Sequence, residues 1–256
     1  IRTSKFQWTT DFNIGFNRNR VTELYGGKPE LKGLKRLEEG RDMDEWYLRE
    51  WAGVDPANGS PLWYTTDENG KRTTTNSYNK ADRVYCGSAA PKFTGGWMNS
   101  FSYKGFTLTA NFDFVYGNLL YNQSRELLDS DGAYADYNSM KLKSGWKRWE
   151  KEGDIATHPK AINGGNKNSN KSSSRYLEKG NYFSLRNLSL GYSIPEKLCG
   201  KLGLQRVNVS CSADNLFTLT PFSGVSPQLS DSSTDGYAGT IYPLSRRIVF
   251  GLNVSF

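Results

Sequence analysis

The sequence predicts an all-β fold whose long antiparallel strands form part of a transmembrane β-barrel. Three observations support this fold class. Apolar and polar residues alternate with a period of two over long segments. Aromatic residues make up 14% of the chain, although its mean hydropathy is only −0.67, which suits strands that face lipid on one side and water on the other. Long polar connections also alternate with short ones along the chain.

The best-defined alternation lies in residues 93–118, where two strands flank Lys104-Gly105. Each strand is longer than the ~5–6 residues usual in globular proteins and matches the ~9–11 residues of a tilted transmembrane strand. A two-residue connection ending in Gly is typical of a tight hairpin turn, because Gly accepts positive φ. A soluble sandwich can show the same alternation with its apolar face turned inward.

The second strand of this hairpin defines two faces. We expect Leu108, Ala110 and Phe112 to face lipid. The intervening Thr109 and Asn111 are then expected to face the lumen of the barrel.

The same alternation recurs elsewhere in the chain. It appears in residues 6–17, 188–194, 207–214 and 248–256, and more weakly in residues 46–54 and 61–66. The sequence therefore predicts six to eight strands. No window approaches the ~20 apolar residues of a membrane-spanning helix, which excludes a helical membrane protein.

The connections follow the pattern of bacterial barrels, in which periplasmic turns are short and extracellular loops are long. If the chain ends in the periplasm, residues 217–244 and 119–172 lie outside the cell, and residues 195–204 and Lys104-Gly105 lie inside. A sandwich has no reason to segregate its loops in this way.

Composition excludes several functions. The net charge is +7, but the basic residues are scattered rather than gathered on one element, which argues against nucleic-acid binding. With one histidine, His158, the chain lacks the usual means for a histidine metal site or a His-centred triad. Cys86, Cys199 and Cys211 are too widely spaced for a zinc site or a disulfide framework, and we expect them to be unpaired. Neither catalysis nor a cofactor is expected.

The long connections contain two candidate sites. Asp129, Asp131 and Asp136 resemble part of a calcium loop, although an ordinary acidic turn is the simpler interpretation because the closing Glu of an EF-hand is missing. Aromatic residues in these loops are candidate contacts for a ligand or partner, although they are equally suited to packing the loops on the barrel rim. They are Trp146, Trp149, Tyr134, Tyr137, Phe222 and Tyr237.

Several motifs make the chain resemble the SusC/RagA family of TonB-dependent outer-membrane transporters. They span nearly the whole chain in order: Gly53-Val-Asp-Pro-Ala-Asn-Gly-Ser-Pro-Leu-Trp-Tyr64, Ala90-Pro-Lys-Phe-Thr-Gly-Gly96, Leu185-Arg-Asn-Leu-Ser-Leu-Gly-Tyr192, Asn215-Leu-Phe-Thr-Leu-Thr220 and Gly251-Leu-Asn-Val-Ser-Phe256. One departure is the segment 224–228, where the family often carries acidic residues. That difference bears on local contacts rather than on the fold.

The resemblance implies a barrel of about 22 strands closed around a plug. Residues 1–256 would form its C-terminal part, without the plug and the N-terminal strands. It further implies TonB-driven import of oligosaccharides or oligopeptides across the outer membrane of a Gram-negative bacterium, with a SusD-like surface lipoprotein as partner. Phe256 would act as a signal for membrane assembly, so its removal should lower membrane abundance. A passive pore, an adhesin barrel and an extracellular glycan-binding sandwich are the alternative functions.

Overall fold

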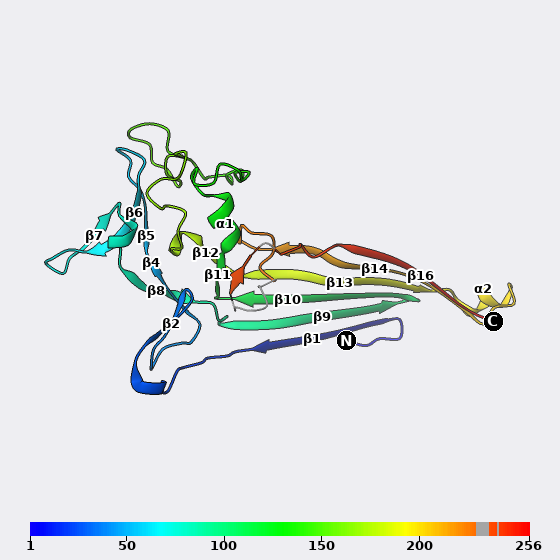
Figure 1. Cartoon of the computed structure of the whole chain (residues 1–256). Helices are drawn as coiled ribbons and strands as arrows, with labels where there is room; N and C mark the ends of the chain where they lie inside the picture. The colour runs from blue at the N-terminus through cyan, green and yellow to red at the C-terminus, as the bar shows by residue number, and fades with distance from the viewer. Residues whose placement is uncertain (229–235, 240) are drawn as a thin grey trace.

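A computed structural model describes residues 1–228, 236–239 and 241–256. It has two parts, a long curved sheet and a mass of small sheets and loops at one end of that sheet (Figure 1). We call the long sheet the wall. We call the second part the cap, which comprises residues 16–92, 117–181 and the described residues between 220 and 246.

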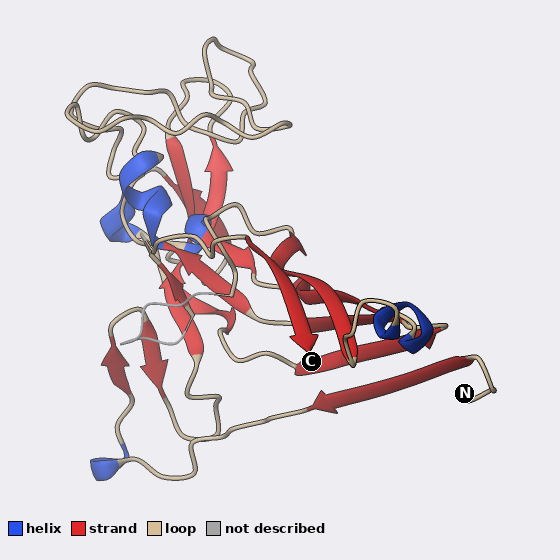
Figure 2. Cartoon of the chain, turned by 90° about the vertical axis from the view of Figure 1, so that its right-hand side faces the viewer, coloured by secondary structure: helices blue, strands red, loops and turns tan. Residues whose placement is uncertain are grey.

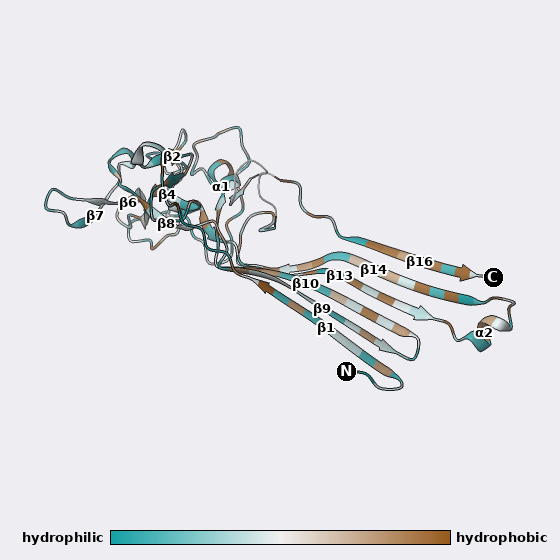
Figure 3. Cartoon of the chain, turned by 90° about the horizontal axis from the view of Figure 1, so that it is seen from below, coloured by the Kyte–Doolittle hydropathy of each residue, from teal (hydrophilic) through white to brown (hydrophobic). Residues whose placement is uncertain are grey.

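The wall is a six-stranded antiparallel sheet with the order β1-β9-β10-β13-β14-β16 (Figure 3). Its strands are β1 (Phe6–Gly15), β9 (Phe93–Tyr103), β10 (Phe106–Tyr116), β13 (Tyr182–Ser193), β14 (Arg206–Leu219) and β16 (Arg247–Ser255). Each has at least the ~9 residues that a tilted transmembrane β-strand needs. The six well-defined strands expected from the sequence are therefore confirmed.

Short and long connections lie at opposite ends of the wall, as expected (Figures 1 and 2). At the short end are Lys104-Gly105 and residues 194–205, which include α2 (Glu196–Gly200). Lys104 and Gly105 have φ of 46° and 87°, the left-handed values that a two-residue hairpin turn of this type requires. All three long connections belong to the cap.

The wall has one apolar and one polar face. Strand register places Phe12, Trp97 and Phe112 side by side on the apolar face, and it places Leu108 and Ala110 on that face as well. Many of these side chains are exposed, including Phe250 at 79% and Leu252 at 69%. A soluble sandwich would cover this face with a second sheet, but the described strands of the wall form one sheet. The sandwich alternative is therefore not supported.

A β-bulge at Arg186 keeps the apolar face continuous across β13. The register pairs Asn111 with Asn187 and then Phe112 with Leu185, so Arg186 is the extra residue. Because of this residue, Leu185 and Leu188 both lie on the apolar face although they are three positions apart. The bulge also lets Arg186 reach Asp113 on the polar face, with its Nε 3.1 Å from Asp113 Oδ1.

The apolar face contains a polar pair at its centre that strand alternation did not predict. Register places Asn99 beside Thr10 and Ala110 on this face. The Trp8 indole N–H donates to Asn99 Oδ1 at 3.1 Å, and the Trp97 indole N–H donates to Thr10 Oγ1 at 2.9 Å. Asn99 is only 5% exposed. Each polar side chain is thus paired with an indole N–H within the apolar face.

We expect Trp8→Phe to destabilise the folded wall by about 1–2 kcal/mol, because it leaves the Asn99 carbonyl oxygen unpartnered in apolar surroundings. Unfolding by denaturant in lipid, for the single variants and the double variant, measures this effect. In an Asn99→Leu background the same tryptophan change should cost much less. Equal costs in both backgrounds would show that the indole acts only through packing.

The described residues of the cap form three small sheets, ordered β12-β11-β15, β2-β3-β4-β8 and β5-β6-β7. Its elements are η1 (Tyr25–Gly27), β2 (Glu30–Lys32), β3 (Lys35–Leu37), β4 (Glu45–Arg49), β5 (Trp51–Val54), β6 (Pro61–Thr66), β7 (Arg72–Thr75), η2 (Tyr78–Lys80), β8 (Arg83–Ser88), β11 (Leu119–Asn122), α1 (Gln123–Leu128), η3 (Ser174–Tyr176), β12 (Leu177–Lys179) and β15 (Tyr237–Ala238). The weaker strand expected at residues 61–66 therefore exists as β6, and the one expected at residues 46–54 is divided into β4 and β5, which belong to different sheets. All three lie in the cap and not in the wall.

Aromatic side chains from distant segments form the core of the cap. Trp46, Tyr121 and Tyr176 are fully buried, and Tyr237 packs its ring edge-on against Trp46 at 5.1 Å. The Trp46 indole N–H donates to the Leu119 carbonyl oxygen at 3.0 Å. This core joins all three long connections, so the cap is a folded unit rather than three separate loops. Among the described residues, no helix is long and apolar enough to cross a membrane.

Candidate functional site

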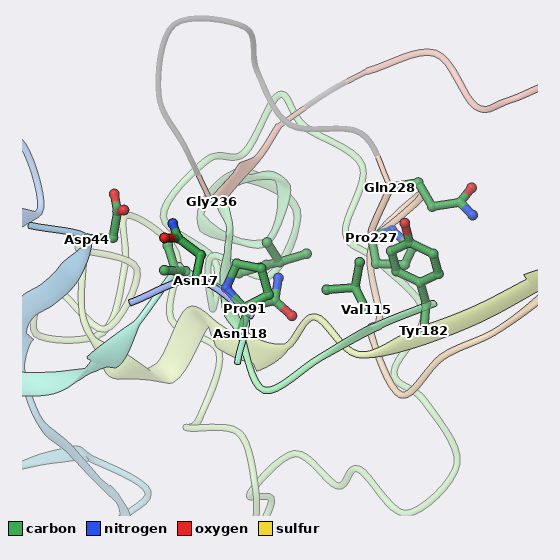
Figure 4. A pocket seen from close by; sticks show the side chains of 12 residues that line it. Asn17, Asp44, Pro91, Val115, Asn118, Tyr182, Pro227, Gln228 and Gly236 are labelled. Carbon is green, nitrogen blue, oxygen red and sulfur yellow. The ribbon is translucent and has the colours of Figure 1, made fainter. Parts of the chain in front are cut away.

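A cavity of about 350 Å³ lies where the wall meets the cap (Figure 4). Val115 and Tyr182 reach it from the polar face of the wall. The remaining lining comes from the cap and includes Asn118, Gln228 and the dipeptide Ala90-Pro91. The cavity therefore opens on the side of the sheet that is expected to face the barrel lumen.

Close packing fixes the position of Asn118 in this cavity. Its backbone carbonyl accepts the Gly180 N–H at 3.0 Å, where the chain leaves β10 and approaches β13. A Cβ at Gly180 would lie 2.6 Å from Asn118 Nδ2, so any larger residue there would displace the amide. Asn118 is 7% exposed and is therefore held rigidly.

The opposite side of the cavity is held by a different set of contacts. Ser223 donates to Glu178 through both its backbone N–H and its hydroxyl, each at 2.6 Å. Phe222 is buried against Leu120 and Ala238. These contacts fix the chain just before Pro227 and Gln228, and Gln228 donates its backbone N–H to Ser226 Oγ at 3.2 Å.

Most charged and hydroxyl groups around the cavity already have partners. The Tyr182 hydroxyl donates to Asp113 Oδ2 at 3.0 Å, and Lys35 Nζ donates to Asp44 Oδ1 at 2.8 Å. Two side-chain amide atoms are exceptions. Asn118 Oδ1 and Gln228 Nε2 are buried without a hydrogen-bond partner among the described residues. A ligand is one way to satisfy such atoms.

A buried cluster of charges lies deeper in the cap. We call Asp129, Asp131, Arg125, Arg148 and Arg175 the ion cluster. Arg175 contacts both aspartates and pairs with Asp131 through both terminal nitrogens, while Arg148 Nη1 donates to Asp131 Oδ1 at 2.7 Å. Arg125 pairs with Asp129 at 3.0 Å. Both aspartates are only 1% exposed. The guanidinium groups of the ion cluster, rather than water, therefore stabilise their negative charges.

The ion cluster extends to His158 and Glu178. His158 Nε2 lies 2.9 Å from Asp129 Oδ2, and Arg125 Nη1 donates to Glu178 Oε1 at 2.9 Å. Because Glu178 also holds Ser223, the cluster supports the segment that carries Gln228.

Burial opposes ionisation of Asp129, but the His158 hydrogen bond and the charge of Arg175 outweigh it and lower the pKa of this carboxyl.

The three aspartates of the candidate calcium loop do not share one environment. Asp129 and Asp131 are buried and face guanidinium groups, whereas Asp136 is exposed. No group of three or more metal-type ligands occurs in the parts of the chain that the structure describes. The arrangement is that of a structural ion-pair network.

The six aromatic candidates divide into buried and accessible residues. Trp149 and Phe222 are 8% and 6% exposed, and Tyr237 belongs to the cap core. Trp146 lies over the ion cluster, with the Arg125 guanidinium 4.4 Å from its ring centroid. Tyr134 and Tyr137 are exposed, and their rings lie 5.3 Å apart. These two tyrosines are accessible to a partner in this conformation.

The three cysteines are unpaired, as expected. Cys86 lies in β8 of the cap, Cys199 lies in α2 at the short-turn end, and Cys211 lies in β14 on the apolar face. Burial raises the pKa of Cys86 to about 11, which keeps this thiol protonated and unreactive.

Comparisons with known proteins agree with this architecture. No family model matches the chain. Two curated relatives from Formosa agariphila, TonB-dependent receptors P39 and P3, are each 28% identical over the whole chain. A solved structure described as the RagAB peptide transporter covers the whole chain with a TM-score of 0.83 and 26% identity. The chain therefore resembles SusC/RagA-type TonB-dependent transporters. A further RagAB structure, described as an open-open state, matches with a TM-score of 0.77 at 23% identity and shows the fold alone.

The SusC/RagA-type resemblance expected from the sequence is thus confirmed, as is the fold class of an outer-membrane β-barrel segment. The chain spans only 29% and 27% of the two curated relatives and 28% of the first solved structure. The cavity residues Asn118 and Gln228 were not identified from the sequence. The only signals there were the Ala90-Pro91 motif and the departure at 224–228.

Proposed function

We propose that this chain forms part of the barrel wall and external cap of a TonB-dependent importer in the outer membrane of a Gram-negative bacterium. The observation that carries the proposal is the wall itself. It joins six strands of transmembrane length with one apolar and one polar face, and it matches SusC/RagA-type transporters over its whole length. The apolar face would contact lipid, and the polar face would line the path of the substrate.

Oligosaccharides or oligopeptides are the proposed substrates. A related structure is described as a peptide transporter, and the polar face of the wall supplies groups for binding such molecules. Asp113 pairs with Arg186, and Asp214 pairs with Arg247 at 2.7 Å, so charged and amide side chains follow this face. The wall performs no covalent chemistry in this proposal.

The decisive experiment is uptake by cells that express the complete transporter. Labelled oligopeptides and oligosaccharides of graded length are supplied with and without TonB. The proposal expects uptake only when TonB is present. Equal uptake in its absence would instead support the passive-pore alternative.

A SusD-like lipoprotein is the proposed partner of the cap, and the accessible tyrosines give a test. We expect Tyr134→Ala with Tyr137→Ala to reduce lipoprotein co-purification, because exposed rigid aromatics contribute strongly to interfaces. Tyr25→Ala is the matched control, since Tyr25 is also exposed but lies in another connection.

The comparison requires that the abundance of the barrel in the outer membrane stays normal in both variants. Unchanged co-purification in the double variant would remove these tyrosines as anchors. The Trp146 and Trp149 pair is a less selective target, because Trp149 packs tightly against Gly59 and its removal would also loosen the cap.

A further inference from the structure

We propose that a hollow on the apolar face of the wall, next to the cap, holds an acyl chain of lipid A, the phosphorylated glycolipid of the outer leaflet. We call this hollow the acyl groove. The inference rests on the proposed function, in which the apolar face contacts lipid and the cap lies outside the cell. An apolar lining and two unpaired basic side chains beside it support the proposal.

The acyl groove has a volume of about 440 Å³ and lies where β9, β10, β13 and β14 reach the cap. Register places most of its lining side chains on the apolar face of the wall, namely Phe93, Phe114, Tyr116, Phe183 and Leu219. Tyr116 is 49% exposed and Leu219 is 63% exposed, so the groove is open on that face. Such a lining offers few partners for hydroxyl or charged groups and suits a hydrocarbon chain.

Asn181 accounts for the hollow at this point of the wall. Strand alternation from Phe183 places residue 181 on the apolar face, where neighbouring positions carry aromatic rings. Asn181 Oδ1 instead accepts the Gly117 N–H at 2.7 Å, and the Phe93 ring stacks on Tyr116 with a centroid distance of 5.0 Å. Because the amide is held at Gly117 and the rings are held by each other, the space between them stays open.

Two basic side chains lie next to the acyl groove. Phe93 lines both the groove and a neighbouring cavity of about 970 Å³, which is also lined by Lys92 and Arg18. Both cations are exposed, and neither forms a salt bridge with another described residue. The stem of Lys92 packs on Gly117, where an added Cβ would lie 2.6 Å from Lys92 Cγ. Since Gly117 also bonds Asn181, Lys92 lies beside the cap end of the groove.

The occupant must therefore combine an acyl chain with an anionic head. Ammonium and guanidinium groups such as those of Lys92 and Arg18 bind phosphate oxygens through charge-assisted hydrogen bonds. Asp42 also lines the neighbouring cavity, but its carboxylate accepts the Ser88 hydroxyl at 2.7 Å and the Asp44 N–H at 2.8 Å. Lipid A carries both acyl chains and phosphate, and it forms the leaflet on the side of the cap. A phospholipid carries phosphate as well but belongs mainly to the opposite leaflet.

Native mass spectrometry of the complete transporter, purified in detergent and titrated with diphosphoryl lipid A, tests the proposal. We expect Arg18→Gln with Lys92→Gln to weaken binding about fivefold to thirtyfold, the effect of losing two cations beside an anionic headgroup. Dephosphorylated lipid A should bind the wild type and this double variant alike. Lys197→Gln with Lys201→Gln is the matched control, because it removes the same charge at the short-turn end.

Leu219→Trp tests the acyl groove itself. The larger side chain should fill the groove and weaken binding of both forms of lipid A about fourfold to fifteenfold, the cost of displacing one or two methylene groups. Leu190→Trp is its control, since Leu190 is 48% exposed on the same face but lies outside the groove. If Leu219→Trp does not assemble, the double charge variant still decides, because both of its side chains are exposed.

Three results would overturn the proposal: lipid A binding no tighter than that of phosphatidylglycerol, unchanged affinity in both the groove and the charge variants, or equal losses in the control variants. Lipid binding in detergent needs no TonB. A transporter that binds lipid A at this site but shows no TonB-dependent uptake would contradict the proposed function and leave the lipid site standing. TonB-dependent uptake without such binding would do the reverse.

Discussion

Replacing Asp131 by Asn should destabilise the cap by about 3–5 kcal/mol, the usual cost of removing one partner from a buried ion pair. The carboxylate of Asp131 accepts hydrogen bonds from Arg148 and Arg175, and Ser169 Oγ donates to it at 2.7 Å. Asn keeps the shape but loses the negative charge. Arg175, whose side chain is 3% exposed, would then have lost its main partner without access to water.

Hydrogen exchange of backbone amides measures this effect in the folded transporter. The Ile162 N–H, which donates to the Asp131 carbonyl at 3.0 Å, should lose protection, and amides in the wall should not. Asp136→Asn is the matched control because Asp136 is exposed in the same segment. If the two variants exchange alike, the ion cluster does not hold the cap together.

Two carboxyl groups with lowered pKa values, one in the ion cluster and one outside it, also give the cap a defined acid sensitivity. The pKa of Asp129 is lowered in the folded state, and the pKa of Asp154 is lowered to about 2 by Lys147 and the backbone N–H groups of Glu150 and Lys151. A lowered folded pKa contributes stability that is fully present above the unfolded value of about 3.9. That contribution is lost as the pH falls through the folded value.

The wall was predictable because apolar and polar residues alternate along most of each strand. Alternation in residues 93–118 gave both strands of the hairpin, the Lys104-Gly105 turn and the shared face of Leu108, Ala110 and Phe112. It failed where the backbone departs from period two. The bulge at Arg186 breaks the alternation, so the sequence pattern revealed β13 only from Leu188, although the strand begins at Tyr182.

The cap was not predictable in the same way, because long-range contacts decide its structure. Its core joins Trp46, Tyr121, Tyr176 and Tyr237, which no local pattern connects. The spacing of Asp129 and Asp131 resembles a cation loop. Only the fold brings Arg175 to Asp131, and that arginine supplies the charge a cation would otherwise provide.

The second large effect is expected on the apolar face of the wall. Ala110→Arg should destabilise the barrel in lipid by about 2–4 kcal/mol if this position lies near the bilayer midplane. Ala110 is the fifth of the eleven residues in β10, and register places it between Asn99 and Leu188 on the apolar face. The Asn99 side chain would hydrogen-bond poorly to the new guanidinium, because its Oδ1 already accepts the Trp8 N–H.

Asn111→Arg is the matched comparison, one residue further along the same strand. Register places Asn111 opposite Met98 and Asn187 on the polar face, where a guanidinium would remain hydrated. The Asn111 variant should therefore lose much less stability than the Ala110 variant. Reversible unfolding of the complete transporter in lipid vesicles measures both. Equal losses would mean that the two faces meet similar surroundings, and the apolar face of this wall would then not be the one that contacts lipid.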